Sequence, residues 1–269
     1  MNDIITIVFR DEISILKLQA QSIEHYCNAD NLGRIIVVIN DDTLDVDSID
    51  PHWWGELHNR VDIVHRSRWA VNYAKDGWLT QQLLKILATE LCISEWSIIL
   101  DAKTLFVRSV PKVDSKPHVG ELDIHPVFKV SQQRVSELFG INLIKLLGPG
   151  GVPFIFNNQL VQDMINEIQT RTNQKFADWF QAQGMITEFI LYSAFLQYKY
   201  GGFYTLYDPS FGLSNINVCH SEVALFDDKL NSMKHGNTLS VSVHRNAWSK
   251  LTSSQQKSYQ DFLMSRGIE

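Results

Sequence analysis

Apolar runs alternate with helix-like spacing along the N-terminal part of the chain. Residues 4–9 and 34–39 are almost continuous apolar runs, as in strands that are buried on both faces of a parallel sheet. Between these runs, apolar residues recur at spacings of three and four, at Ile13, Leu16, Ala20 and Ile23. This spacing is typical of a helix that buries one face. A strand, a helix and a strand in this order predict a βαβ unit with a parallel sheet.

The same alternation continues through a third short strand at residues 61–64. A helix follows, with its apolar side marked by Leu79, Leu83, Leu84, Leu87 and Leu91, and it leads into an apolar strand over residues 96–101. We therefore expect an α/β fold with a mostly parallel central sheet flanked by helices. Residues 1–269 are expected to form a single domain, with a nucleotide-binding half over about residues 1–105 and a second half over about residues 106–269.

The second half has a less regular pattern. We expect a helix over residues 131–147 with Ser131 as its N-cap, a break at residues 148–151, and a strand over residues 152–156 that Pro153 confines to a sheet edge. The remaining expected elements are a helix around residues 161–168 capped by Asn157 or Asn158, a helix over residues 187–200 ended by Gly201 and Gly202, strands at residues 203–207 and 239–244, and a helix whose capping box begins at Thr252.

Composition and charge narrow the classes of partner. Hydrophobic residues make up 45% of the 269 residues, which is enough for a sizeable core. The formal net charge of −6 argues against a nucleic-acid partner, which would need a basic face. The cysteines Cys27, Cys92 and Cys219 are odd in number and form no C-x-x-C pair. A disulfide framework or zinc site is therefore not expected, and a reducing cytoplasm is the simplest setting.

The sequence also bears on the membrane. The N-terminus lacks the basic region of a signal peptide, and no apolar run approaches the roughly 20 residues that span a bilayer. We therefore expect a cytoplasmic protein with no transmembrane segment. Contact with the inner face of the membrane through exposed aromatic side chains stays open.

Polar side chains follow the predicted parallel strands where each strand ends. Asp101 ends the strand over residues 96–101, and it either closes an Asx turn or faces a ligand crevice. Arg10 and Asp11 follow the first strand, and Asn40 and Asp41 follow the second. The loops that carry them are neighbours in a parallel sheet, so these residues either hold a base and ribose or serve as caps and turns.

Three further places carry candidate chemistry. Gln81 and Lys85 are four apart on the helix before Asp101, so their shared face is either solvated or looks onto the crevice, where Lys85 would contact phosphate. Glu188 opens a helix, where the macrodipole favours a carboxylate, and it is also a candidate general base. His244 and Arg245 follow an alternating strand. The histidine suits a metal, a phosphate or a structural hydrogen bond, and the arginine suits phosphate.

Together these residues resemble the GT-A class of nucleotide-sugar glycosyltransferases. The resemblance runs from the first strand to His244. Within this class, the chain is most similar to a group of bacterial glycosyltransferase-like proteins. It is carried by the N-terminal βαβ unit and by the segments Gly77-Trp78-Leu79-Thr80-Gln81-Gln82-Leu83-Leu84-Lys85, Leu100-Asp101-Ala102-Lys103, Gly151-Val152-Pro153-Phe154, Thr187-Glu188-Phe189 and His244-Arg245. It implies a GT-A-like α/β fold, a nucleotide-sugar donor, and a saccharide or glycolipid acceptor bound by the second half.

The resemblance also implies roles for individual residues. Members of the class end the central strand with Asp-x-Asp, which binds a divalent metal, whereas here Lys103 replaces the second carboxylate. Either Asp101 and another group such as His244 still hold Mg²⁺ or Mn²⁺, or the enzyme works without a metal and Lys103 neutralises phosphate. The donor site would comprise Arg10, Asp11, Asn40, Asp41, Gln81, Lys85, Asp101, Lys103 and Arg245, and Gly151 and Pro153 would contact the acceptor.

Glu188 matches the position of the catalytic base in inverting members of the class, while a retaining reaction stays open. The leading hypothesis is therefore a sugar transferase of surface polysaccharide or glycolipid assembly. A catalytically inactive nucleotide- or sugar-binding protein is the alternative. The replacement of the second carboxylate by Lys103 favours this alternative. A nucleotidyltransferase is a third hypothesis. Enzymes of that class usually carry a Gly-rich, basic loop after the first strand, whereas the segment Phe9-Arg10-Asp11-Glu12 has no glycine, which disfavours this hypothesis.

Overall fold

A five-stranded sheet with the strand order β3-β2-β1-β4-β8 forms the centre of the computed structural model, which describes residues 1–69, 77–113, 116–117, 120–148, 151–208 and 213–269. Its strands are β1 Asn2–Val8, β2 Leu32–Ile39, β3 Val61–His65, β4 Trp96–Asp101 and β8 Phe154–Asn157. The first four strands run parallel, and β8 pairs antiparallel with β4 at the sheet edge. The predicted mostly parallel sheet and the edge position of the strand after Pro153 are thus confirmed.

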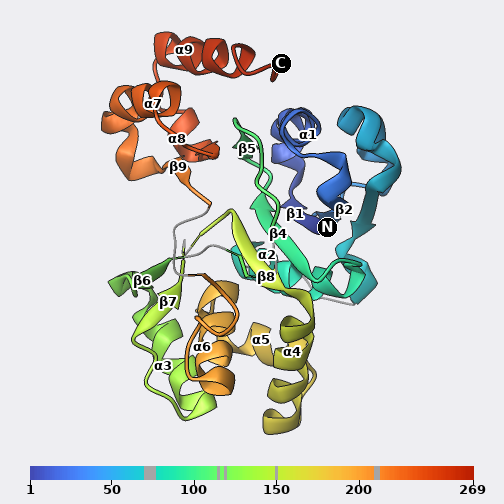
Figure 1. The fold of residues 1–269 in the computed structure, drawn as a ribbon, viewed down its shortest axis with the longest axis vertical. Coiled ribbons are helices and arrows are strands. Elements are labelled where there is room, and N and C mark those ends of the chain that lie inside the picture. The colour runs from blue at the N-terminus through green and yellow to red at the C-terminus, as the bar shows by residue number, and fades with distance from the viewer. Residues whose placement is uncertain (70–76, 114–115, 118–119, 149–150, 209–212) are drawn as a thin grey trace.

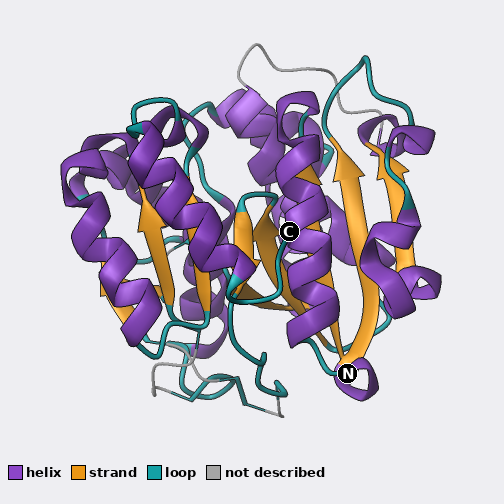
Figure 2. Ribbon diagram, turned by 90° about the horizontal axis from the view of Figure 1, so that it is seen from above, coloured by secondary structure: helices purple, strands orange, loops and turns teal. Residues whose placement is uncertain are grey.

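The apolar runs form strands because the sheet is covered on both faces. Every residue of β1 is buried, and α1 Ile13–Tyr26 connects β1 to β2 as the helix spacing predicted. The helix α2 Gly77–Leu87 leads toward β4. Figure 2 shows the helices flanking the strands. This arrangement aims the carboxyl ends of β1, β2 and β4 toward one edge of the sheet.

A second, three-stranded sheet follows directly from β4. Only Ala102 and Lys103 separate β4 from β5 Thr104–Phe106, which pairs with β10 Ser240–Val243, and β10 pairs in parallel with β9 Asn215–Val218. One face of this sheet packs on α7 Phe226–His235, α8 Arg245–Trp248 and α9 Ser253–Met264 through a hydrophobic cluster of its own. Figure 1 shows these helices beside β5 and β9, at the end of the molecule away from α3–α6.

The remaining helices pack below the central sheet in the view of Figure 1. They are α3 Lys129–Phe139, α4 Asn158–Thr172, α5 Phe176–Gln183 and α6 Glu188–Tyr200, and β6 Glu121–Asp123 pairs with β7 Lys145–Leu147 beside them. Short 3-10 helices are η1 Arg10–Glu12, η2 Ala29–Asn31, η3 Val46–Ser48, η4 Pro51–Arg60, η5 Arg66–Trp69, η6 Ala88–Leu91, η7 Pro126–Phe128 and η8 His220–Leu225. The first nine residues of α6 are buried, so its N-terminus is anchored in the core.

Helix caps follow the predicted chemistry. Asn157 accepts from the backbone N–H of Leu160 at the start of α4, and Thr187 accepts from that of Ile190 at the start of α6. Thr252 and Gln255 form the predicted capping box of α9. No helix in the described ranges is both long and apolar enough to cross a membrane.

Three predictions for the second half are wrong. The helix expected over residues 131–147 begins at Lys129, because η7 runs straight into it, and it ends at Phe139, where Gly140 forms the C-cap with a φ of 66°. Ser131 therefore lies within the first turn, and residues 145–147 form β7. The strand expected at residues 203–207 is a turn in which Tyr207 donates its backbone N–H to Phe203. Pro149 and Gly150 of the expected break lie outside the described residues.

Candidate active site

A cavity of about 1120 Å³ lies at the carboxyl ends of β1, β2 and β4. Its wall continues along α2 as far as Lys85, over the first turn of α6 and over β9 and β10. In a parallel α/β sheet this edge is where ligands bind, because the strand order reverses there and opens a crevice. The cavity brings together most of the predicted residues: Arg10, Asp11, Asp41, Gln81, Lys85, Asp101, Lys103, Gly151, Glu188, His244 and Arg245.

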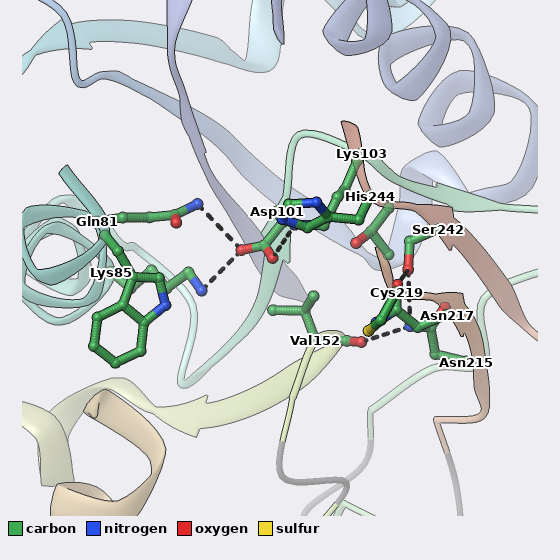
Figure 3. Close-up of polar contacts among 12 residues, drawn as sticks. Gln81, Lys85, Asp101, Lys103, Val152, Asn215, Asn217, Cys219, Ser242 and His244 are labelled. Carbon is green, nitrogen blue, oxygen red and sulfur yellow. Dashed lines mark hydrogen bonds and ion pairs between the residues drawn. The ribbon is translucent and has the colours of Figure 1, made fainter. Parts of the chain in front are cut away.

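The centre of the cavity is a chain of alternating charges. Asp101 accepts from Lys103 Nζ at 2.7 Å through Oδ2 and from Lys85 Nζ at 2.8 Å through Oδ1. Lys85 Nζ also lies 3.0 Å from Glu188 Oε1. Gln81 Nε2 donates to Asp101 Oδ1 at 3.3 Å. Figure 3 shows Asp101 held between Gln81 and Lys85 on one side and Lys103 on the other.

Burial makes this chain of charges strongly coupled. The Lys85 side chain is only 3% exposed, and that of Asp101 is 16% exposed. Burial by itself would raise the pKa of Asp101, but Lys85 and Lys103 outweigh it and hold that pKa well below its usual value. Burial likewise would lower the pKa of Lys85, but Asp101 and Glu188 raise it above its usual value. Both groups are therefore charged at neutral pH.

Lys85, which was predicted to contact phosphate, is paired with two carboxylates in this structure. Its ammonium group bridges two carboxylates and lies 5.3 Å from the centre of the Phe189 ring. An ammonium group has three N–H donors, and two of them are directed at Asp101 and Glu188. Lys85 therefore positions these two carboxylates, and Lys103, which is 16% exposed, is the more accessible cation.

Glu188 is buried at the start of α6 with a side-chain exposure of 1%. Burial raises its pKa, and Lys85 acts in the opposite direction. The macrodipole at the helix N-terminus favours the ionised carboxylate, but loss of hydration outweighs it and raises the pKa of Glu188. Its Oε2 atom is buried and has no hydrogen-bond partner among the described residues. Glu188 lines the cavity, and a carboxylate of raised pKa at such a place is suited to accept a proton from a bound hydroxyl.

The loops after β1 and β2 form the other side of the cavity. Asp41 accepts from the backbone N–H groups of Thr43 and Arg10 at 2.8 and 3.4 Å. Asp41 also lies 3.8 Å from the Arg10 guanidinium. Asp11 and Arg245, which are far apart in the sequence, form an exposed ion pair. Both pairs place carboxylates and guanidinium groups at the cavity mouth.

Two predicted residues are not in the cavity wall. Asn40, just after β2, is fully buried and accepts from Arg66 at 3.0 Å, whereas the next residue, Asp41, lines the cavity. Pro153 is also absent from the lining, whereas Val152 and Gly151 belong to it. The predictions that Asn40 contacts the donor and Pro153 the acceptor therefore lack structural support.

The residues around Asp101 do not fit a divalent cation. Both carboxylate oxygens accept from ammonium groups, and Lys103 stands where a second carboxylate ligand was sought. Within the described part of the chain, no three His, Cys, Asp or Glu side chains form a group that could hold a metal ion. Mg²⁺ and Mn²⁺ prefer oxygen ligands that are free of competing cations.

His244 is set up as a hydrogen-bond donor. Its Nδ1 atom accepts from the backbone N–H of Asn246 as the N-cap of α8, so in the neutral ring Nε2 carries the proton. Burial lowers the pKa of His244, with Lys103 and Arg245 acting in the same direction. Neutral His244 can therefore donate one hydrogen bond into the cavity from Nε2.

The structure adds functional candidates that the sequence analysis missed. Glu12 lines the cavity, burial raises its pKa, and its Oε2 atom is buried without a hydrogen-bond partner in the described chain. Asn215, Asn217 and Ser242 form another part of the wall. The alternation Asn-Ile-Asn-Val and Ser-Val-Ser-Val was the available signal for the latter group.

A parallel sheet with the cavity at its carboxyl edge, extended by a short second sheet, defines a GT-A-like fold. Solved glycosyltransferases are similar to it. The galactosyltransferase LgtC in complex with donor and acceptor sugar analogues matches with a TM-score of 0.50 and 10% identity, over 98% of this chain and 95% of that chain. An active-site mutant of LgtC matches with a TM-score of 0.51 and 10% identity, with the same coverage. The resemblance to the GT-A class is thereby confirmed for the fold.

A third similar structure is mouse xyloside xylosyltransferase 1, at 9% identity and a TM-score of 0.49, over 91% of this chain and 98% of that chain. The chain itself belongs to a family of unknown function, DUF6492, whose model matches residues 4–242. Comparison with curated proteins finds no significant match.

Proposed function

We propose that this protein is a glycosyltransferase that moves a sugar from a nucleotide-sugar donor to an acceptor hydroxyl without a divalent metal. The observation that carries the proposal is the Lys103–Asp101–Lys85–Glu188 chain at the carboxyl edge of a GT-A-like sheet. It combines an accessible ammonium group for phosphate with a buried carboxylate for the acceptor. Surface polysaccharide or glycolipid assembly is the proposed setting.

Lys103 replaces the divalent metal as the positive charge that binds the diphosphate of the donor. One of its three N–H donors binds Asp101, which leaves two for the diphosphate oxygens of the donor. Arg245 at the cavity mouth and the Nε2–H of His244 are further donors for phosphate. Fixed positive charge and N–H donors of this kind stabilise the negative charge that develops on the leaving diphosphate.

Glu188 is the proposed general base of an inverting reaction. Its carboxylate, in the cavity lining, takes the proton of the acceptor hydroxyl while that oxygen attacks the sugar carbon, and the bond from this carbon to the nucleotide diphosphate breaks. The raised pKa makes Glu188 a stronger base, and Lys85 favours its ionised form. A retaining reaction would proceed without such a base, so the effect of Glu188 on turnover distinguishes the two.

A catalytically inactive nucleotide- or sugar-binding protein is the second candidate. The observation that favours it is the full occupation of Asp101 by ammonium groups, which removes the usual metal position. This candidate binds nucleotide but releases none from a nucleotide sugar. A nucleotide-release assay therefore separates the two functions.

Nucleotide release from UDP-, GDP- or CMP-sugars is expected to be equally fast in EDTA and in added Mn²⁺ or Mg²⁺. The reason is that two ammonium groups already satisfy both oxygens of Asp101. The matched control is Lys103→Asp, which restores a second carboxylate and should make release depend on metal. Strong inhibition of the wild-type protein by EDTA would contradict metal independence, and binding without release would favour the inactive protein.

Lys103→Ala is expected to weaken binding of nucleoside diphosphates about ten- to a hundredfold, because a hydrogen bond to a charged group is lost. The loss should be smaller for UMP than for UDP in titration calorimetry. Lys145→Ala is the control, since Lys145 is exposed and pairs with Asp123 away from the cavity lining. Equal affinities of the wild-type and Lys103→Ala proteins for UDP would remove Lys103 from the donor site.

A further inference from the structure

The three-stranded sheet has one polar and one apolar face. Ile216, Val218, Val241 and Val243 pack into the hydrophobic cluster under α7, α8 and α9. The alternate residues Asn215, Asn217, Ser240 and Ser242 share the opposite face, because successive side chains of a strand point to opposite sides. Asn215, Asn217 and Ser242 line the cavity. We call these three residues the amide wall.

The amide wall is held in place by its own hydrogen bonds. Ser242 donates to Asn217 Oδ1 at 2.9 Å, and Asn215 Nδ2 donates to Ser242 Oγ at 3.3 Å. Asn215 Nδ2 also donates to the carbonyl of Val152 at 3.1 Å. Figure 3 shows this network facing the space beside Asp101 and His244. The side chains are therefore fixed before any ligand arrives.

Strand formation does not explain these residues. Asparagine is depleted in strands, yet Asn215 and Asn217 both stand in β9 and line the cavity. The side-chain amide of Asn217 has two N–H donors and two acceptor sites. One N–H binds Cys219 Sγ at 2.9 Å and one acceptor site binds Ser242, so a donor and an acceptor remain for a ligand.

The register of the sheet places the amide wall next to the charged centre. Ser242 pairs with Asn217 on one side and with Thr104 on the other. Thr104 directly follows Lys103, whose ammonium group binds Asp101. A ligand that contacts Asn217 and Ser242 therefore lies beside Lys103 and Asp101.

We propose that the amide wall binds the hydroxyl groups of a carbohydrate ring and selects among sugars by the orientation of those hydroxyls, an assignment that rests on the proposed transferase function. A sugar hydroxyl both donates and accepts a hydrogen bond, which matches the donor and acceptor left on Asn217. A fixed array of such groups rejects an epimer because the wrong orientation leaves buried polar groups unpaired. The ring belongs to either the donor sugar or the acceptor saccharide.

The test uses Asn217→Ala and Ser242→Ala, with Ser240→Ala as the matched control. Ser240 lies on the same face of β10 and donates to Asn215 at 3.1 Å, but it does not line the cavity. Titration calorimetry compares UDP with UDP-glucose and UDP-galactose, and saturation-transfer NMR measures free glucose, galactose and N-acetylglucosamine with UDP present. Melting temperatures of all variants check folding, and Ser242→Thr keeps the hydroxyl.

The two cavity variants are expected to weaken sugar binding about three- to tenfold, the effect of losing a neutral hydrogen bond, while the affinity for UDP stays constant. A loss of affinity confined to the UDP-sugars would mean that the amide wall binds the ring of the donor sugar. A loss of affinity confined to the free sugars would mean that it binds the acceptor saccharide. Unchanged binding of every sugar in both variants, or an equal loss in Ser240→Ala, overturns the proposal. Absence of UDP binding in the wild-type protein with retained, Asn217-dependent sugar binding overturns the transferase and leaves the amide wall standing.

Discussion

Glu188→Gln is expected to lower turnover about a hundredfold to ten-thousandfold, the usual effect of losing a positioned base. Glutamine keeps the shape of the side chain and an oxygen that accepts from Lys85, so the cavity is preserved. The donor dissociation constant should stay nearly constant, because Glu188 is assigned to the acceptor hydroxyl. Steady-state kinetics with calorimetric donor binding measures both quantities.

The pH dependence of turnover gives a second readout for the same residue. A base acts only when it is ionised, so turnover falls as the pH drops through the pKa of Glu188. Burial raises that pKa above 4.5, so the acid limb of the wild-type profile should lie above pH 4.5. The limb should be missing from the residual activity of Glu188→Gln.

Glu12→Gln is the matched comparison. Glu12 is also a cavity carboxylate whose pKa is raised by burial, and its Oε2 atom likewise lacks a described partner. Loss of turnover in Glu12→Gln with normal turnover in Glu188→Gln would transfer the role of base to Glu12. Normal turnover in both variants would leave the inverting mechanism without support.

The sequence predicted the elements that depend on local pattern. The continuous apolar runs of β1 and β2 and the caps Asn157 and Thr252 were all readable, because each signal lies within a few residues. The missed helix α7 also had a local signal in Phe226, Leu230 and Met233, which follow helix spacing and are buried. The missed strand β9 had only the short alternation Asn-Ile-Asn-Val, a weak signal because two of its four residues are asparagines, which are depleted in strands.

The sequence predicted where the site lies, but not which charged side chains contact one another within it. The position of Asp101 at the end of a buried strand predicted the cavity edge, and the shared face of Gln81 and Lys85 predicted that both would reach it. Helix spacing carries no information on the partner of Lys85, because Glu188 lies 103 positions further along the chain. The bridging role of Lys85 and the raised pKa of Glu188 therefore required the tertiary structure.

Asp101→Ala is expected to lower the free energy of unfolding by about 3–5 kcal/mol, in addition to abolishing transfer, because it breaks a buried ion pair. Lys85 is 3% exposed and would keep only Glu188 as a carboxylate partner. A residue that only contacts ligand would leave the free energy of unfolding nearly unchanged when it is replaced by alanine. Urea unfolding at neutral pH measures the difference.

The control for this effect is Asp62→Ala. Asp62 on β3 pairs with Arg34 at 3.0 Å, but the two side chains are 44% and 43% exposed. Exposed pairs of this kind contribute about 0–1 kcal/mol. Similar losses in Asp62→Ala and Asp101→Ala would mean that the Lys103–Asp101–Lys85 arrangement does not contribute to stability as a buried pair.

The pH dependence of the stability lost on replacing Asp101 shows which titrating group is responsible for that loss. Lys85 and Lys103 overcome the effect of burial and hold the pKa of Asp101 below its usual value, so its contribution is present above the unfolded pKa of about 3.9 and is lost as the pH falls further. The stability gap between the wild-type protein and Asp101→Asn should therefore stay constant from pH 7 to about pH 5 and narrow only below about pH 4. A gap that already narrows between pH 7 and pH 5 would point to Glu188, whose pKa is raised, as the group that controls the network.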